Sequence, residues 1–376
     1  MAPFPPLPAR KRSVGMKIIS TFICLFSSLI LISPALAEEN PAFDMDLAPA
    51  ASDEPVVSFH GYYEFEHLSA ERKNSTFDAH KLTIWMGVKL NPRAYLSSEI
   101  EYEHAPKVTG DGGGTGQIKV DSAQLRLTLT DSLAASFGIF YVPFGIEYLS
   151  YPGHINKLVT RPKAMKGGGV IPGTWSDVGA GATLGLGGWA TADIYAVNGD
   201  ARNGTISRDT DENGNESKTI GARLMLDKMA PGVNLGASYA TGMWDPDSKL
   251  ASTRTGVHLR LETSLITGVA MAPVVIAEWV EGVDEQASSI DHKDKEVSGY
   301  YMQISFSLLP TLELVARHGE YNPDKTASAE SNIETSGGLV WKAMDNVKFK
   351  MEYQQNGPAG NGAKKDLIAL QLAANW

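Results

Sequence analysis

The sequence predicts an all-β protein, a transmembrane antiparallel β-barrel of about 16 strands. Apolar and polar residues alternate along segments of about ten residues, as a tilted membrane-spanning strand requires, whereas strands in soluble sandwiches usually have about five or six. Tight connections alternate with long polar ones, as expected for a barrel whose two ends differ. The chain also ends on an alternating segment closed by an aromatic residue, Trp376.

Residues 1–37 are expected to be a signal peptide. Lys17 precedes an apolar run over residues 18–32, and Ala35-Leu36-Ala37 matches a small-x-small cleavage site. A membrane anchor is disfavoured because the run is short and ends in Ser33-Pro34. Cys24, the single cysteine, lies inside this segment, so the exported chain would have no thiol. An exported chain without cysteine is typical of proteins of the bacterial envelope.

The net charge of the chain disfavours one class of binding partner. The chain carries 33 basic and 43 acidic side chains, and without the four basic residues of the signal peptide its net charge changes from −10 to −14. Such an excess of negative charge disfavours a nucleic-acid partner. Residues 38–55 are acidic and rich in Pro and Ala, so we expect a periplasmic N-terminal tail there and the barrel over residues 56–376.

Alternation and turn residues place the strands. We expect them over residues 56–68, 78–90, 95–105, 117–130, 134–142, 177–186, 189–198, 218–228, 233–243, 253–264, 270–281, 296–308, 311–321, 332–343, 347–356 and 366–376. The segments 189–198 and 270–281 alternate poorly, so 14 or 18 strands remain alternatives. The expected tight turns are Asn91-Pro92, Asp131-Ser132, Gly187-Gly188, Ala230-Pro231-Gly232, Thr267-Gly268, Leu309-Pro310 and Asp345-Asn346.

The same alternation assigns the lumen wall. Facing lipid, a Lys or Arg at mid-membrane would cost roughly 2–4 kcal/mol, so the charged set is expected to face the pore. Its members are Lys81, Lys89, Glu99, Glu101, Glu103, Arg126, Arg223, Arg254, Arg260, Glu262, Glu313, Arg317, Lys348, Lys350 and Glu352. Both signs occur, so the wall alone does not determine ion preference. Charges that pair across neighbouring strands are the alternative for any one of them.

The longest predicted connection, residues 143–176, carries the strongest functional signal. It contains Lys157, Arg161, Lys163 and Lys166 and has no acidic residue between Glu147 and Asp177. A long connection without obvious secondary structure is usually functional or disordered. Arg and Lys are also the residues that line anion and phosphate pores.

The segment from Phe137 to Leu149, FGIFYVPFGIEYL, together with Arg161, resembles the phosphate-selective porin O/P family. That resemblance implies a 16-stranded barrel whose long third loop folds inward, a homotrimer, and passage of phosphate or other small anions. The ending at Trp376 resembles the signal read by the barrel assembly machinery of the outer membrane. Beyond the four loop cations the chain has no obvious arginine ladder or lysine cluster.

We therefore expect a porin in the outer membrane of a Gram-negative bacterium, in contact with lipid and lipopolysaccharide and passing small anionic or polar solutes. The four loop cations are expected at the pore constriction, where a narrow low-dielectric passage focuses their field. A loop lying outside, with its cations on anionic lipopolysaccharide, is the alternative placement. A structural or adhesive barrel and a sheath for an electron-transfer partner are the alternative functions.

Other signals are weak. Residues Asp209–Asn215 match the opening of a calcium-binding loop, but Ile220 occupies the position of the final glutamate, so a solvated loop is the better interpretation. The eight histidines show no metal-ligand spacing, and no nucleophile or phosphate-loop motif occurs. We expect no enzyme activity, no cofactor and no metal.

Overall fold

The structure is a computed structural model that describes residues 55–71, 74–105, 116–199, 216–269, 271–287, 294–326, 331–357 and 366–376. The predicted signal peptide, residues 38–54 of the predicted tail and the Asp209–Asn215 motif lie outside the described residues. Among the described residues, no helix combines the length and the apolar composition needed to cross a membrane.

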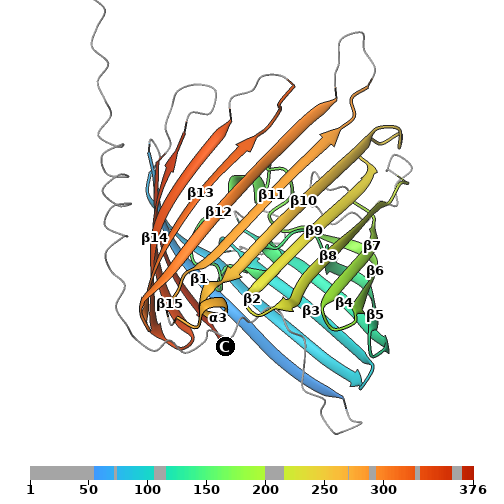
Figure 1. Cartoon of the computed structure of the whole chain (residues 1–376), viewed down its shortest axis with the longest axis horizontal. Coiled ribbons are helices and arrows are strands. Elements are labelled where there is room, and N and C mark those ends of the chain that lie inside the picture. The colour runs from blue at the N-terminus through green and yellow to red at the C-terminus, as the bar shows by residue number, and fades with distance from the viewer. Residues whose placement is uncertain are drawn as a thin grey trace, which may run out of the picture.

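The strands form a closed antiparallel barrel (Figure 1). Its 16 strands each pair with their neighbours in sequence, and β1 closes the ring by pairing with β16. Their bounds are β1 Val56–Ala70, β2 Thr76–Asn91, β3 Ala94–Glu103, β4 Gln117–Thr130, β5 Leu133–Tyr141, β6 Ser176–Leu186, β7 Ala190–Val197, β8 Thr219–Ala230, β9 Val233–Met243, β10 Ala251–Glu262, β11 Val274–Asp284, β12 Lys295–Leu309, β13 Leu312–Asn322, β14 Asn332–Met344, β15 Val347–Asn356 and β16 Leu367–Asn375. The predicted count of 16 is confirmed, and the two segments that alternate poorly are β7 and β11.

Six connections at one end of the barrel have two or three residues, and we call this the short-turn end. The tight turn predicted at Thr267-Gly268 is wrong. This connection contains the short helix α3, Thr263–Thr267, and β11 begins only at Val274. Gly268 has a left-handed backbone, with φ of +70°, and its N–H donates to the Ser264 carbonyl at 2.8 Å. The glycine therefore ends a helix, and the sequence alone does not distinguish that role from a hairpin turn.

The two faces of the barrel differ as a membrane barrel requires. On β15, Met351 is 48% exposed, whereas the neighbouring Lys350 and Glu352 are buried. Two exposed aromatic side chains near the turn between β14 and β15, Trp341 and Phe349, stack with their ring centroids 5.4 Å apart. The apolar set therefore faces lipid and the charged set faces the lumen.

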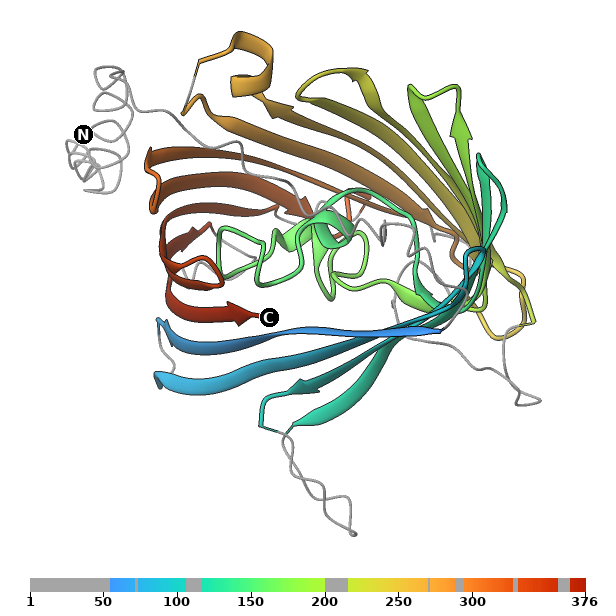
Figure 2. The ribbon, with the colours of Figure 1, turned by 90° about the horizontal axis from the view of Figure 1, so that it is seen from below.

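The connection between β5 and β6, residues 142–175, lies inside the barrel; we call it the inner loop. Figure 2 shows it in green within the ring of strands. It contains one helical turn, α2 (Glu147–Ser150), and the 3-10 turn η1 (Lys163–Met165). The prediction of a long third loop folded into the lumen is confirmed.

Candidate functional site: the inner loop and the lumen wall

The start of the inner loop is bound by side chains of β9 and β11. The N–H of Gly145 donates to Ser238 Oγ at 3.0 Å. The N–H groups of Ile146 and Glu147 donate to the two carboxylate oxygens of Glu278 at 3.1 and 3.3 Å. Glu278 is buried, so these bonds replace the water that its carboxylate has lost.

Gly145 meets two separate requirements at this anchor. Its φ of +66° is a left-handed conformation that side-chain-bearing residues rarely adopt. A Cβ at this position would also lie 1.9 Å from Glu278 Oε1. Any larger residue would therefore displace the Glu278 carboxylate or the loop that it binds.

The middle of the inner loop is clamped by β13 and β15 through Thr160. The N–H and the hydroxyl of Thr160 donate to the two oxygens of Glu352, each at 2.7 Å. Arg317 donates through Nη1 to the Thr160 carbonyl at 2.6 Å and through Nη2 to its Oγ1 at 2.7 Å. Arg317 and Glu352 are both fully buried, so this network holds the loop through charge-assisted bonds in a dry environment.

Two further cations of the wall bind loop carbonyls. Lys350 Nζ donates to the Gly153 carbonyl at 2.6 Å, and Arg254 Nε donates to the Val170 carbonyl at 2.8 Å. These contacts come from β15 and β10, so the loop is tied to widely separated parts of the wall. The inner loop is therefore a fixed part of the lumen.

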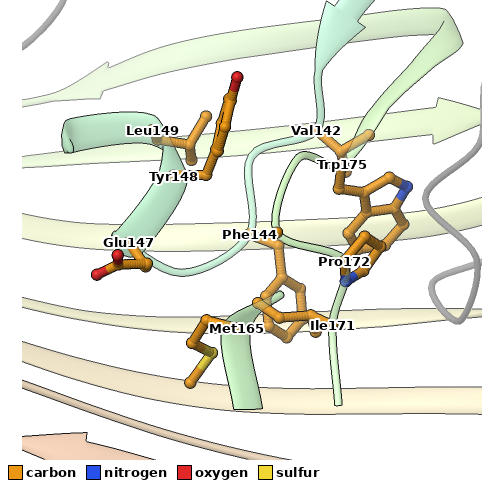
Figure 3. A pocket seen from close by; sticks show the side chains of 10 residues that line it. Val142, Phe144, Glu147, Tyr148, Leu149, Met165, Ile171, Pro172 and Trp175 are labelled. Atoms are coloured by element: carbon orange, nitrogen blue, oxygen red, sulfur yellow. The ribbon is translucent and has the colours of Figure 1, made fainter. Parts of the chain in front are cut away.

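Apolar packing supplements these bonds. Phe144, Met165 and Ile171 belong to a buried cluster that also includes Val280 on β11 and Tyr301 on β12. Figure 3 shows the first three side chains beside one another around a cavity of about 20 Å³, roughly enough for one water molecule. An apolar patch on the inner wall, unusual for a water-filled barrel, is thus covered by the loop.

The four predicted loop cations all lie in the inner loop, and they have different partners. Lys157 Nζ is 2.7 Å from Glu313 Oε2 on β13. Arg161 Nη1 is 3.3 Å from Glu147 Oε1 within the loop itself. Its Nη2 donates to the Tyr151 carbonyl at 2.9 Å, so both ends of the guanidinium already have partners.

The other two cations have a different environment. Lys163 and Lys166 are half-buried, and the described residues show no ion pair for either side chain. Burial lowers the pKa of the Lys163 ammonium, although the Glu334 carboxylate, which accepts the Lys163 N–H at 3.0 Å, acts in the opposite direction. Next to them, Gly167 and Gly168 are exposed.

The residues predicted to line the lumen wall pair with other wall residues, act on the inner loop or line a cavity. Lys81 lies 2.7 Å from Glu101 and 3.3 Å from Glu103, Arg223 lies 2.9 Å from Asp193, and Arg260 pairs with Glu262. Glu99 accepts a hydrogen bond from Tyr141 at 2.7 Å. The charge of Lys348 acts on His154 in the loop. Lys89 and Arg126 line a cavity of about 500 Å³ at the short-turn end, together with Arg93.

In several ion pairs on the inner face of the barrel, including that of Lys119 on β4 with Glu101 on β3, the side chain of the cation is more exposed than that of its carboxylate. The Lys119 side chain is 37% exposed and Glu101 only 1%, and Lys157 is 18% exposed against 1% for Glu313. A long lysine stem lies along the wall and leaves its ammonium in water, whereas the shorter acid stays at the wall. Arg254, Arg317 and Lys350, which bind the loop, are buried exceptions.

The anchors Gly145, Thr160 and Glu278 were not among the predicted site residues. Gly145 lies in the segment that carries the family resemblance, so a close backbone approach there could have been suspected. Thr160 and Glu278 carry no local signal, because their roles follow from contacts more than 100 residues apart in sequence.

Comparison with known proteins gives the following similarities. No protein-family model matches the chain. An uncharacterised protein of Aquifex aeolicus (strain VF5) is 24% identical, with 88% of this chain and 83% of that protein covered. The anion-selective porin from Comamonas acidovorans superposes with a TM-score of 0.61 at 12% identity, covering 86% of this chain and all of the porin. The trimer form of OmpT, an outer membrane protein of Vibrio cholerae, gives 0.54 at 11% identity, covering 86% and 100%. The chain therefore shares its fold with bacterial outer-membrane porins.

Proposed function

We propose that this protein is a porin that allows small hydrophilic solutes to diffuse passively across the outer membrane of a Gram-negative bacterium. The observation that carries this proposal is a closed barrel with an apolar outer face, a charged inner face and a loop anchored across the lumen. A structural barrel would need no charged lumen, because lipid-facing residues alone hold it in the membrane. The proposed function is diffusion and involves no catalysis.

A planar-bilayer recording of the refolded mature chain tests this function. Open, ohmic channels are expected, with heat-denatured protein as the control. Folded barrel that inserts without conducting would contradict the porin proposal and favour the structural or adhesive alternative.

We further propose that the pore prefers small anions and that Lys157, Arg161, Lys163 and Lys166 contribute to this preference. Support comes from the more accessible cations of the lumen ion pairs and from the inward position of the four loop cations. A narrow passage with low-dielectric walls strengthens the field of such charges. Lys163 and Lys166 are expected to contribute most, because Lys157 and Arg161 each form an ion pair with a carboxylate, which partly cancels their fields.

The reversal potential under a salt gradient measures the preference. The double variant Lys163→Glu/Lys166→Glu should shift it toward cations more than Lys157→Glu/Arg161→Glu does. Lys249→Glu is the matched control, because this lysine is exposed in the connection between β9 and β10 and paired with Asp247. A wild-type pore that already prefers cations, or equal reversal potentials in all variants, would refute the role of these residues.

The proposal extends to the family, the solute, the oligomeric state and the partners. Membership of the phosphate-selective porin O/P family, and with it phosphate as a solute, is supported by the segment from Phe137 to Leu149. A homotrimer is supported by the shared fold with proteins that include a trimeric one. Contact with lipopolysaccharide and recognition of Trp376 by the assembly machinery follow from the proposed location.

A further inference from the structure

Glu64, Glu66 and His80 bring their side chains together on the inner face of β1 and β2. Their ligating atoms all lie within 4.8 Å of one another, and His80 Nδ1 is 2.7 Å from Glu66 Oε1. Glu64 and Glu66 are buried, at 2% and 3% exposure, and His80 is half-buried. The three residues thus form a compact group of one imidazole and two carboxylates.

A register shift in the sheet produces this group. Glu64 pairs with Lys81, but two residues further along β1 Glu66 pairs with Asp78, so β2 holds one extra residue in this interval. Strict alternation would place His80 on the face opposite to Lys81. The extra residue interrupts the alternation, and His80 instead reaches the carboxylate of Glu66. Such bulges re-aim side chains and are common next to functional sites.

Glu64 lacks the partners that a buried carboxylate normally has. Its Oε1 is fully buried and accepts no hydrogen bond from the described residues. The carboxylate lies against Gly153 of the inner loop, where a Cβ would be 2.0 Å from Oε1, so the loop encloses the group. A buried carboxylate oxygen without a partner is costly, and a bound cation would satisfy it.

Neighbouring side chains orient Glu66 and His80, as the residues around a metal site orient its ligands. Gln371 on β16 donates to Glu66 Oε1 at 2.7 Å and so fixes the orientation of this carboxylate. The ring of His104 stacks on His80 with centroids 5.2 Å apart, and His104 Nδ1 is bonded to Asp78 at 2.6 Å. The charge of Lys350 acts on both glutamates, and neutralisation by this lysine alone is the competing explanation.

We propose that Glu64, Glu66 and His80 bind a divalent transition-metal cation inside the lumen. Imidazole and carboxylate together suit Zn²⁺ and similar ions, whereas Ca²⁺ and Mg²⁺ prefer oxygen ligands alone. Small side-chain rotations would bring the three ligating atoms to the bond lengths of roughly 2.0–2.2 Å that Zn²⁺ makes with such groups. The proposal concerns binding and does not depend on whether the barrel conducts.

Calorimetric titration of the metal-stripped, folded mature chain with Zn²⁺ tests the proposal. We expect one saturable site, with Ca²⁺ binding more weakly. His80→Ala and Glu64→Gln should each weaken Zn²⁺ binding by about tenfold or more. His318→Ala is the control and should bind as the wild type does, since His318 is an exposed residue of β13 whose Nδ1 contacts Thr335.

Folding of each variant is checked by its heat-modifiable mobility. Zinc-edge X-ray absorption of the wild type gives an answer that needs no variant, and it should show one imidazole together with oxygen ligands. Absence of saturable Zn²⁺ binding, unchanged affinity in folded His80→Ala, equal affinity for Ca²⁺ or a zinc spectrum without imidazole would each overturn the proposal.

Discussion

At the scale of single residues, Gly145 and Gly168 of the inner loop share a left-handed backbone, with φ of +66° and +80°, but differ in their surroundings. A Cβ on Gly168 would have no other atom within 4 Å, whereas a Cβ on Gly145 would meet the Glu278 carboxylate. Gly168→Ala should therefore cost only the backbone strain, about 1 kcal/mol. Gly145→Ala should cost a further 1–3 kcal/mol, roughly, from overpacking against Glu278.

Limited proteolysis of the folded barrel measures this difference, because a released inner loop becomes accessible to protease. Cleavage within residues 142–175 should be faster in Gly145→Ala than in Gly168→Ala or the wild type. Equal cleavage of the two variants would mean that the anchor on β11 does not hold the loop.

The buried environment of His154 predicts how the stability of the protein depends on pH. Burial lowers its pKa from 6.5 to about 3, and the charges of Lys350 and Lys348 act in the same direction. The unfolded chain therefore binds a proton between these pH values that the folded chain does not bind, and the free energy of unfolding falls as the pH falls. From pH 7 to pH 5 the loss amounts to about 2 kcal/mol.

The variant His154→Gln should lack this part of the acid sensitivity. The thermal midpoint of heat-modifiable mobility, measured at pH 7 and pH 5, should fall less in the variant than in the wild type. Other titrating groups are common to both proteins and cancel in the comparison. An equal fall of the thermal midpoint in the variant and the wild type would show that His154 is in contact with water.

At the scale of elements, the last strand closes the barrel on the first. The N–H of Trp376 donates to the Gly61 carbonyl at 3.0 Å, and the Gly61 N–H donates to the Trp376 carbonyl at 3.3 Å. The indole ring covers Gly61, where a Cβ would be 2.2 Å from the ring. Trp376→Ala keeps the backbone bonds and loses the ring, whereas deletion of Trp376 removes both.

We expect the deletion to lower the thermal midpoint of the barrel more than Trp376→Ala does, because the deletion also breaks two backbone hydrogen bonds of the seam. Both should lower the amount of folded barrel in the outer membrane if the assembly machinery reads the aromatic residue. Unchanged assembly in both variants would show that this residue is dispensable.

The strands could be predicted from the sequence far better than the contacts between residues distant in sequence. Every predicted strand except β11 ends within two residues of its observed bounds, because alternation with a period of two is imposed locally by lipid on one side and the lumen on the other. The error at Thr267-Gly268 has a local cause, since glycine serves helix ends and hairpins equally. The partners of Lys157 and Arg161 depend on how the inner loop folds within the barrel. The group at His80 depends on the register between β1 and β2, which the pattern of one strand does not contain.

At the scale of the whole molecule, the ring of strands and the inner loop are two layers with separate sources of stability. Pairing of β5 with β6 continues to Tyr141 and Ser176, where the loop begins and ends, so a short linker could join these residues without disturbing the ladder. Replacement of residues 145–173 by such a linker should leave a closed barrel. Buried groups such as Glu278, Arg317 and Glu352 would then be hydrated and so keep hydrogen-bond partners, whereas Val280 and Tyr301 would lose their apolar cover.

For the barrel without the inner loop we therefore expect an unchanged circular-dichroism spectrum, a lower thermal midpoint and a higher single-channel conductance. A control that removes residues 246–248 from the connection between β9 and β10 should leave the conductance unchanged. Failure of the loopless chain to fold would show that the loop is required for barrel formation, and an unchanged conductance would show that it does not limit the pore.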